Sequence, residues 1–462
     1  MSTSTVDPII CGRVTRSLDR TELFAVNGQR LADIGVVPQL LAQTALHELR
    51  AAADGIPPDP AILVRAAELF CSGEPGGETV AEYQHNTARA TGLAIATVRR
   101  AARDIMAEVK SLPDATVADL PPSALASGVR IHWVAAGRVF AAVMASNHPA
   151  PNASWIQALY HGYSVVVRPG GRDPFTARRL VFSLLEAGLP PHRIAFLPCD
   201  HRVGEYLLSQ ADRGIVYGGD DAVRRWQHSR QVTTRGPGRT KALLDRKCTA
   251  DIVDHLTLSA AFDGGTRCNN LSTILTSQSP GEVADALAAQ LAEVPVAAPS
   301  DTIAILPAID AGRVDGFLRQ LDGLRTGLTD HSAALNAGDA FVKLDDGSFL
   351  ARPLVMSTTD PHHPAVGLEL PFPFVVVAPW ESSSGAAPLR NSLVANLLTK
   401  QETVVEQALR EPTIRKVTLG KVLPWSARPG VPHEGNFTQF LLEPKGVVTI
   451  AMLRPGDLRC VG

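Results

Sequence analysis

Hydrophobic side chains recur at helical spacing through the first quarter of the chain. The leucines between Leu40 and Leu49 follow the period of a helix, and residues 88–109 form an Ala- and Arg-rich stretch without a proline. This spacing predicts that residues 35–110 are mostly helical.

The pattern changes to short apolar runs after residue 128. Two extended stretches within residues 129–144, separated by Gly137, suggest a β-hairpin. Beyond them we expect strands at 163–167, 194–197 and 215–217, and helices at 154–162, 176–188 and 205–210. This alternation predicts a parallel sheet with crossover helices, and hence an α/β nucleotide-binding unit.

A second α/β run begins after Gly236. Its expected strands lie at 241–245, 271–275, 302–306, 374–378, 415–419 and 446–452, and its expected helices at 251–262, 281–293, 312–321 and 393–409. The chain therefore consists of two successive α/β units, without an internal repeat or a low-complexity segment.

Composition fits a globular enzyme larger than one small core. The chain has 462 residues, of which 45% are hydrophobic and 19% charged. Because 44 basic and 46 acidic side chains leave a net charge of −2, we expect no nucleic-acid or membrane-surface partner. The first residues do not resemble a signal peptide, and no apolar run reaches the roughly 20 residues of a membrane helix. These features predict a soluble, cytoplasmic protein.

The cysteines suggest one reactive thiol. The six are Cys11, Cys71, Cys199, Cys248, Cys268 and Cys460. Their spacing contains no CxxC pair or Cys/His ligand pattern, so we expect reduced thiols, no disulfide framework and no metal. Cys268 stands out because it follows the paired glycines of FDGGTRCNN, and Gly265 leaves room near its sulfur. Such a place suits a nucleophilic thiolate, although an ordinary buried cysteine is the alternative.

Several segments, taken in order, resemble the aldehyde dehydrogenase superfamily. MASNHPAPNASWIQALYHGYSVVVRPGGRDPFTARRL is similar to the family's stretch from the active-site asparagine through the cofactor-ribose strand. LLEAGLPPHRIAFLP is similar to the family's next helix and strand, and VYGGDDAV to its phosphate-facing turn. GGTRCNN matches the nucleophile turn, and GLELPFPFVVV matches the glutamate segment. Within the superfamily, the acyl-thioester reductase branch, which contains the long-chain acyl-CoA reductases, looks nearest.

The resemblance implies an aldehyde dehydrogenase-like α/β fold with a Rossmann-type cofactor domain, an α/β catalytic domain and a small oligomerisation arm. It places the N-terminal helices and the cofactor domain in residues 1–235 and the catalytic cysteine domain in 236–399, with 400–440 returning to the first domain. Residues 128–144 and 445–456 become candidate oligomerisation strands, so a homodimer or homotetramer is expected.

The resemblance also implies catalytic roles. Cys268 would attack the substrate carbonyl, and the Asn147 amide would hold the oxyanion together with the Cys268 backbone N–H. Glu369 would position the nicotinamide ribose, and Phe372 would pack on the nicotinamide. The alternatives are a structural asparagine in a turn and an ordinary core aromatic residue.

Cofactor binding is expected along two further segments. Gly218 and Gly219 would let the backbone approach the pyrophosphate. Arg168 occupies the position of the family's lysine, and Gly171, followed by Arg172, that of its ribose-binding glutamate. Losing an anion and keeping guanidinium groups favours a 2′-phosphate, so we expect NADPH, with NAD as the alternative.

One departure from the family pattern concerns the base that activates water. Aldehyde-oxidising members carry a glutamate upstream of the cysteine, but residues 222–244 contain neither Asp nor Glu. An enzyme that transfers its acyl group to or from a thiol needs no such base. We therefore expect NADPH-dependent reduction of an acyl thioester, either acyl-CoA or an acyl group on a carrier protein, to an aldehyde.

Two other functions stay open. If Glu434 supplies the base from another loop, the chain would oxidise aldehydes to acids with NAD(P)+. A catalytically silent binding subunit is the third possibility, against which the presence of Cys268 and Asn147 argues.

Overall fold

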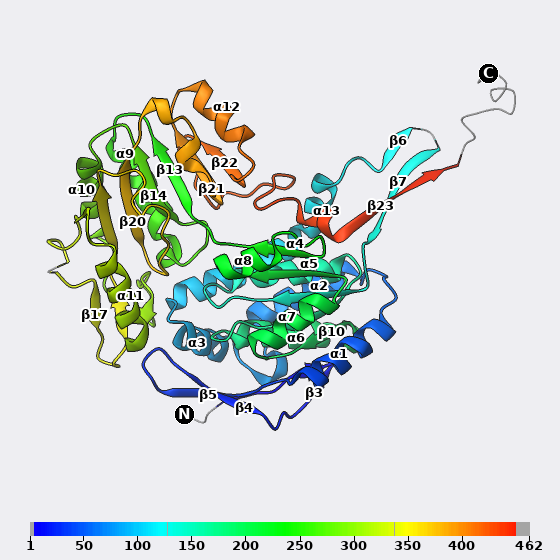
Figure 1. Cartoon of the computed structure of the whole chain (residues 1–462). Helices are drawn as coiled ribbons and strands as arrows, with labels where there is room; N and C mark the ends of the chain where they lie inside the picture. Colours follow the sequence, from blue (N-terminus) through cyan, green and yellow to red (C-terminus); the bar gives the residue numbers. More distant parts are fainter. Residues whose placement is uncertain (1–3, 127, 337, 450–462) are drawn as a thin grey trace, which may run out of the picture.

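Two seven-stranded sheets organise the chain, and Figure 1 shows them in two separate domains. The computed structural model describes residues 4–126, 128–336 and 338–449. The first sheet has the order β12-β11-β8-β9-β10-β2-β3, and the second has the order β16-β19-β20-β14-β13-β21-β22. The expected α/β class is confirmed.

Five parallel strands form the centre of the first sheet. They are β8 Val139–Val143, β9 Ser164–Arg168, β10 Ile194–Phe196, β11 Arg213–Tyr217 and β12 Val232–Arg235. Beyond β10, the short strands β2 (Ile9–Ile10) and β3 (Arg13–Val14) extend the sheet antiparallel. Alternate side chains of β8 enter two different hydrophobic clusters, so helices cover both faces of the sheet.

The connections of this sheet reverse direction between β8 and β11. From β8, α5 (Ala153–Tyr160) and α6 (Pro174–Glu186) lead through β9 to β10. Then α7 (His201–Gln210) carries the chain back past β8 to β11, and α8 (Asp220–Trp226) leads on to β12. Open α/β sheets bind ligands at the carboxyl ends of the strands beside such a reversal.

The N-terminal region contains strands that the sequence pattern did not predict. A three-stranded sheet, β1 Ser4–Val6, β5 Arg30–Gly35 and β4 Arg20–Phe24, lies along the edge of the first domain (Figure 1). The helical region after it is confirmed as α1 Gln39–Ala52, α2 Pro60–Ser72, α3 Val80–Thr91 and α4 Ile95–Asp119. Across the described part of the chain, no helix is long and apolar enough to span a bilayer.

The second sheet contains β14, the strand that follows Cys268. Its strands are β13 Thr240–Leu244, β14 Leu271–Thr276, β16 Leu328–Asp330, β19 Leu354–Thr358, β20 Phe374–Pro379, β21 Val394–Leu398 and β22 Lys416–Leu419. All pair in parallel except β16. The helices α9 Ala250–Ala261, α10 Pro280–Leu291 and α11 Ala311–Gly323 accompany them, with a small sheet of β15 Ala308–Ile309, β18 Phe349–Ala351 and β17 Phe341–Lys343.

Two expectations about this domain are wrong. The helix expected at 393–409 is strand β21 followed by α12 (Glu402–Arg410), because the apolar run before Thr399 has the length of a buried strand. The strand expected at 302–306 is absent from this described stretch, where two isoleucines stay exposed and a turn leads into β15.

The arm also differs from its expected boundaries. Strand β7 (Val129–Ala135) pairs with β23 (Leu442–Val448) and with β6 (Ala124–Ala126), and these strands project from the molecule (Figure 1). The expected hairpin within 128–144 is wrong, since β8 is an apolar central strand of the first sheet. The return of 400–440 to the first domain is wrong for β22, which extends the second sheet. Residues 450–456 lie outside the described residues.

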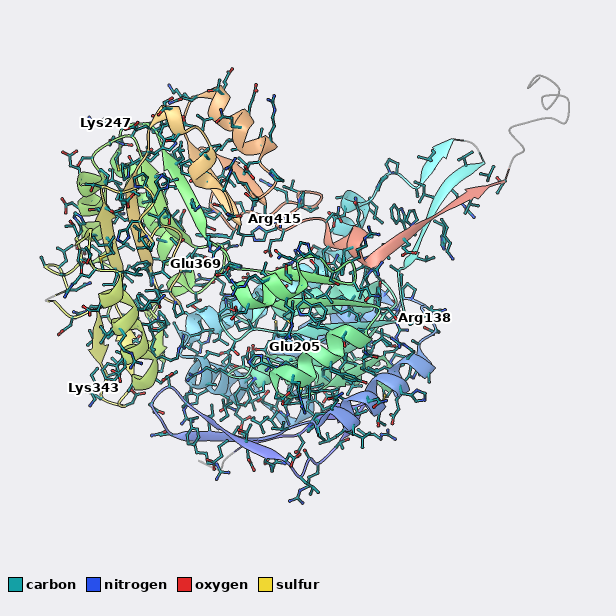
Figure 2. All side chains as sticks on the ribbon, in the orientation of Figure 1. Arg138, Glu205, Lys247, Lys343, Glu369 and Arg415 are labelled. Atoms are coloured by element: carbon teal, nitrogen blue, oxygen red, sulfur yellow. The ribbon has the colours of Figure 1, made fainter. Side chains whose placement is uncertain are left out.

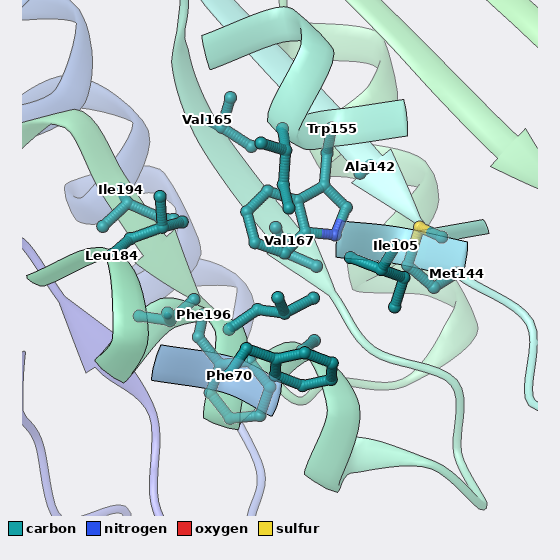
Figure 3. Packing of buried hydrophobic residues seen from close by; sticks show 14 of the residues in the cluster. Phe70, Ile105, Ala142, Met144, Trp155, Val165, Val167, Leu184, Ile194 and Phe196 are labelled. Atoms are coloured by element: carbon teal, nitrogen blue, oxygen red, sulfur yellow. The ribbon is translucent and has the colours of Figure 1, made fainter. Parts of the chain in front are cut away.

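The core of the first domain packs aromatic side chains between sheet and helices. Figure 3 shows Phe196 of β10 near Phe70 of α2, with Trp155 of α5 over Val165 and Val167. All five side chains are essentially inaccessible to solvent. This apolar layer supports the carboxyl ends of β8 and β9, from which the loops carrying Asn147 and Arg172 extend.

Truncating one of these aromatic residues should destabilise the first domain. We expect Phe196→Ala to lower the free energy of unfolding by about 3–5 kcal/mol, because it removes a buried ring and leaves a cavity. Leu40→Ala, at a position that is 76% exposed, should change it by less than about 0.5 kcal/mol. Urea denaturation of both variants measures this, and equal midpoints would contradict the assigned core.

Candidate active site

The nucleophile turn joins α9 to the amino end of β14. Asp263, Gly264 and Gly265 have positive φ angles of 51°, 68° and 69°, a conformation that glycine adopts readily. A Cβ atom on Gly265 would lie 2.5 Å from the backbone nitrogen of Pro373, so no larger residue fits. The turn therefore packs tightly against the segment before β20 and holds Cys268 at the amino ends of the strands.

A buried carboxylate anchors this turn. Asp263 Oδ1 lies 2.7 Å from Arg100, and its Oδ2 lies 2.6 Å from Arg267 and 3.3 Å from His148 Nε2. Arg267 also binds Asp104 at 2.6 Å. Burial opposes ionisation, but the His148 hydrogen bond and the two arginines hold the pKa of Asp263 below its usual value. Sequence reasoning missed this network because its members lie far apart along the chain.

Asn147, the expected oxyanion residue, lies in the loop after β8 beside the nucleophile turn. Its Nδ2 donates to the Thr266 carbonyl at 3.0 Å, and Asn147 and Cys268 line the same two cavities. The carboxyl end of the first sheet thus brings an amide to the amino end of the second. The structure places these two residues together, as the resemblance implies.

Glu369 lies on the side of the second domain that faces the first, whereas Lys247 lies at its far end (Figure 2). Its carboxylate accepts hydrogen bonds from the Gly238 N–H at 2.9 Å and the Arg239 N–H at 2.5 Å. Burial raises the pKa of Glu369 to about 7, and these two donors oppose that rise. A Cβ atom on Gly238 would lie 1.6 Å from the Cys268 carbonyl, so this close approach needs glycine.

Glu434, which sequence analysis considered as an alternative base, lies in the loop that precedes α13 (Phe437–Leu441). Its Oε1 accepts from the Gly236 N–H at 3.2 Å, and its Oε2 lies 3.5 Å from Arg235 Nε. Burial raises the pKa of Glu434, although Arg235 opposes the rise. The segment that lacks its own carboxylate therefore binds one from another loop.

The environment of Cys268 keeps its thiol protonated. Burial, followed by the negative charges of Glu434 and Glu369, raises the pKa of Cys268 to about 12. A thiolate is the reactive form of cysteine, so any reaction of this sulfur would require a nearby base to accept its proton. Glu434 and Glu369 are the two carboxylates whose charges reach this sulfur.

A cleft of about 1120 Å³ opens at the carboxyl ends of β8, β9 and β11, beside the reversal of winding. Arg168, Gly171 and Arg172 line it after β9, and Gly218 and Gly219 line it after β11. Its volume and its position suit a dinucleotide. These five expected cofactor residues are therefore brought together in one cleft, whereas Glu369 and Phe372 line a neighbouring cavity beside Cys268.

Arg168 and Arg172 differ in whether a carboxylate neutralises the guanidinium group. Arg168 Nε donates to the Cys199 carbonyl at 3.2 Å. Arg172 binds the Asp310 carboxylate at 2.8 Å, so part of its charge is already neutralised. A Cβ atom on Gly171 would meet no atom within 4 Å, so the space beside it is open to a ligand.

In the turn after β11, the negative charge of Asp220 is partly neutralised. A Cβ atom on Gly219 would meet no atom within 4 Å, so this backbone is open to a ligand. Asp220, which follows it, is bound by the Arg239 guanidinium at 2.6 Å.

Phe372, expected to contact the nicotinamide, is 1% exposed and packs edge-on against Phe317. This packing favours the alternative that Phe372 is an ordinary core aromatic residue.

A second cavity, of about 370 Å³, reaches Cys268 without touching the β9 and α8 segments of the cofactor cleft. Asn147 and Cys268 line it together with α4, α5 and the loop that carries Glu434. Cys268 also lines a cavity of about 630 Å³ that shares Asn147, Gly218 and Gly219 with the cofactor cleft, so two cavities reach its sulfur.

Comparison with known proteins settles the family. A family model described as the aldehyde dehydrogenase family matches residues 77–436. The chain belongs to the aldehyde dehydrogenase family. This confirms the superfamily that the motifs resemble, whereas the acyl-thioester reductase branch stays a prediction.

Curated aldehyde dehydrogenases match part of the chain. Geranial dehydrogenase of Castellaniella defragrans is 26% identical over 51% of this chain and 50% of its own length. The 1-pyrroline-5-carboxylate dehydrogenase 2 of Halalkalibacterium halodurans is 24% identical over 58% of this chain and 54% of its own. The chain thus spans about half the length of these relatives.

Solved structures share the aldehyde dehydrogenase fold over nearly the whole chain. A gamma-glutamyl-gamma-aminobutyraldehyde dehydrogenase from Burkholderia cenocepacia has a TM-score of 0.79 at 18% identity, covering 97% of both chains. An indole-3-acetaldehyde dehydrogenase in complex with NAD+ has a TM-score of 0.80 at 17% identity, again covering 97% of both. At these identities the likeness establishes the fold.

Removing the charge of Glu434 should lower the pKa of Cys268. We expect the pH profile of Cys268 alkylation by iodoacetamide to shift to lower pH by about one unit in Glu434→Gln, because one anion near the thiolate is lost. Peptide mass spectrometry separates this cysteine from the others. Glu381→Gln, in an exposed loop, is the control, and coincident profiles would show that Glu434 does not act on the sulfur.

Proposed function

We propose that the chain oxidises an aldehyde to a carboxylic acid with NAD(P)+, through an acyl-enzyme on Cys268. The observation that carries this proposal is the Glu434 carboxylate, which lines the second cavity beside Cys268 and replaces the base missing from residues 222–244. The matched relatives, named as dehydrogenases of geranial and of pyrroline carboxylate, support oxidation better than the thioester reduction favoured by sequence analysis.

Residues around Cys268 supply each step. The Cys268 sulfur adds to the aldehyde carbon, and its proton passes to a neighbouring carboxylate. The Asn147 amide and the Cys268 N–H donate to the oxygen that becomes negative, and one such donor contributes roughly 10²–10³ in rate. Bound NAD(P)+ supplies the hydride acceptor. The carbon is thereby oxidised from hemithioacetal to thioester.

Hydrolysis then frees the acid. Glu434, with its raised pKa, accepts a proton from a water molecule that attacks the thioester carbon, and the Cys268 sulfur leaves. General-base assistance of this kind contributes about 10²–10⁴-fold. Arg235 and the Gly236 N–H fix the carboxylate in place, so that its free lone pairs remain for the water.

Acyl transfer to or from a thiol is the second candidate. It is favoured by the absence of an acidic residue from 222–244 and by the contacts that already occupy Glu434. In that case an acyl-CoA or a carrier-bound acyl group would be the substrate, or the product of the reverse reaction, and NADPH the reductant. Dependence on an added thiol separates the two.

For the cofactor, we propose NADP(H) over NAD(H). The open space at Gly171 and the cation Arg168 support a 2′-phosphate, and the pairing of Arg172 with Asp310 weakens the preference. Within the described residues, the outer strands of the arm, β6 and β23, each pair on one side only, which supports a homo-oligomer formed by strand addition.

The proposal predicts a distinct defect for Glu434→Gln. Wild-type protein should turn over an aldehyde panel with NADP+ or NAD+ in the absence of CoA. Glu434→Gln should release about one equivalent of NAD(P)H per active site and then slow by about 10²–10⁴-fold, because acylation survives and hydrolysis does not. Stopped-flow absorbance at 340 nm records both phases.

Two controls make the result specific. Cys268→Ala should show neither burst nor turnover while still binding the cofactor, and Glu381→Gln should behave as wild type. Oxidation only in the presence of CoA or pantetheine, with Glu434→Gln unimpaired, would replace the proposal by thioester chemistry.

A further inference from the structure

The second cavity has a wall made by one face of α4. Glu108, Leu112, Ala115 and Asp119 line it, and their spacing of four, three and four places them on the same side of the helix. At a rise of about 1.5 Å per residue, the two carboxyl-bearing positions lie about 16 Å apart along the axis. The wall is therefore apolar in its middle and acidic at each end.

The arginines that line this cavity are already neutralised. Arg267 lies 2.6 Å from both Asp104 and Asp263, and Arg235 lies 3.5 Å from Glu434. These pairings leave neither guanidinium free to attract an anionic substrate. Asp263 is shared with Arg100, so three carboxylates neutralise three arginines and leave no excess positive charge for an incoming carboxylate.

The histidines of the cavity do not add positive charge. Burial lowers the pKa of His148, and burial together with the charges of Lys416 and Arg235 lowers the pKa of His433 to about 4. Both rings are therefore neutral near pH 7, and the electrostatic character of the cavity depends on its carboxylates.

Glu108 is the carboxylate that has no partner. Among the described residues it makes no hydrogen bond and no ion pair through its side chain, although Asp104 and Arg267 are near enough to influence its pKa. Glu108 is an exposed residue of α4 that lines the cavity, and desolvation of its carboxylate, together with the nearby charge of Asp104, raises its pKa. Asp119, in contrast, accepts a hydrogen bond from Thr438 at 2.6 Å.

We infer that this cavity selects aldehydes that carry a protonated amine away from the carbonyl, with Glu108 as the acceptor of the ammonium group. An ammonium group would give the Glu108 carboxylate three hydrogen-bond donors and a paired cation, and none of the described residues supplies either by direct contact. The apolar residues Leu112 and Ala115 accommodate a methylene chain. The inference rests on the proposed aldehyde oxidation and names its substrate class as ω-aminoaldehydes.

Specificity constants for matched aldehydes test this inference. We expect kcat/KM for 3-aminopropanal, or for a longer ω-aminoaldehyde, to exceed that for the neutral aldehyde of equal length at least tenfold, and succinic semialdehyde to be the poorest substrate. Glu108→Gln should reduce the ammonium-to-neutral ratio about tenfold or more, mainly through KM. Asp114→Asn, at an exposed position on the same helix that is not among the lining residues, should keep the ratio.

The outcomes separate the inference from the function on which it rests. If neutral aldehydes are oxidised but the ammonium substrate is not preferred, or if Glu108→Gln leaves the ratio unchanged, the substrate class is wrong and aldehyde oxidation stands. If no aldehyde is oxidised, the proposed function fails.

A binding measurement then still tests the cavity without turnover. Propylamine, and not butyrate, should protect Cys268 from iodoacetamide, and Glu108→Gln should lose this protection. Equal protection by both ligands, or by neither, would overturn the assignment.

Discussion

The buried carboxylate of Asp263 is the interaction on which the site depends. It draws together α4 through Arg100, the loop after β8 through His148, and the nucleophile turn through Arg267. Removing one member of such a network leaves uncompensated charge inside the protein, which is strongly destabilising. The network therefore fixes where Cys268 and Asn147 meet, although neither residue contributes a charge to it.

Two cavities near Cys268 are lined by different structural elements. The cleft beside the first sheet follows the general rule for open α/β folds, with glycines and an arginine at the carboxyl ends of strands. The other cavity is formed by a helix face and a loop, and carboxylates set its charge. The charges of Glu434 and Glu369 raise the pKa of Cys268. The same two carboxylates are therefore the nearby acceptors for the proton of its thiol.

Local sequence patterns predicted much of this fold, but they could not predict which side chains that are distant in the sequence contact one another. The continuous apolar run at 163–167 identified a central strand, and the glycines before Cys268 identified its turn. The run before Thr399 suits a helix or a strand equally, so β21 was assigned wrongly. No spacing rule connects Asp263 with Arg100, or Glu434 with Cys268. The family resemblance supplied the partnership of Asn147 and Cys268, which lie in different domains.

The fate of the acyl group tests the central claim most directly. Wild-type protein would be incubated with an aldehyde and NAD(P)+ in H₂¹⁸O, with and without CoA, and the products analysed by mass spectrometry. Aldehyde oxidation through a hydrolysed acyl-enzyme predicts a free acid that carries ¹⁸O introduced at hydrolysis, with or without CoA. An acyl-CoA product, and no acid in the absence of CoA, would contradict the account.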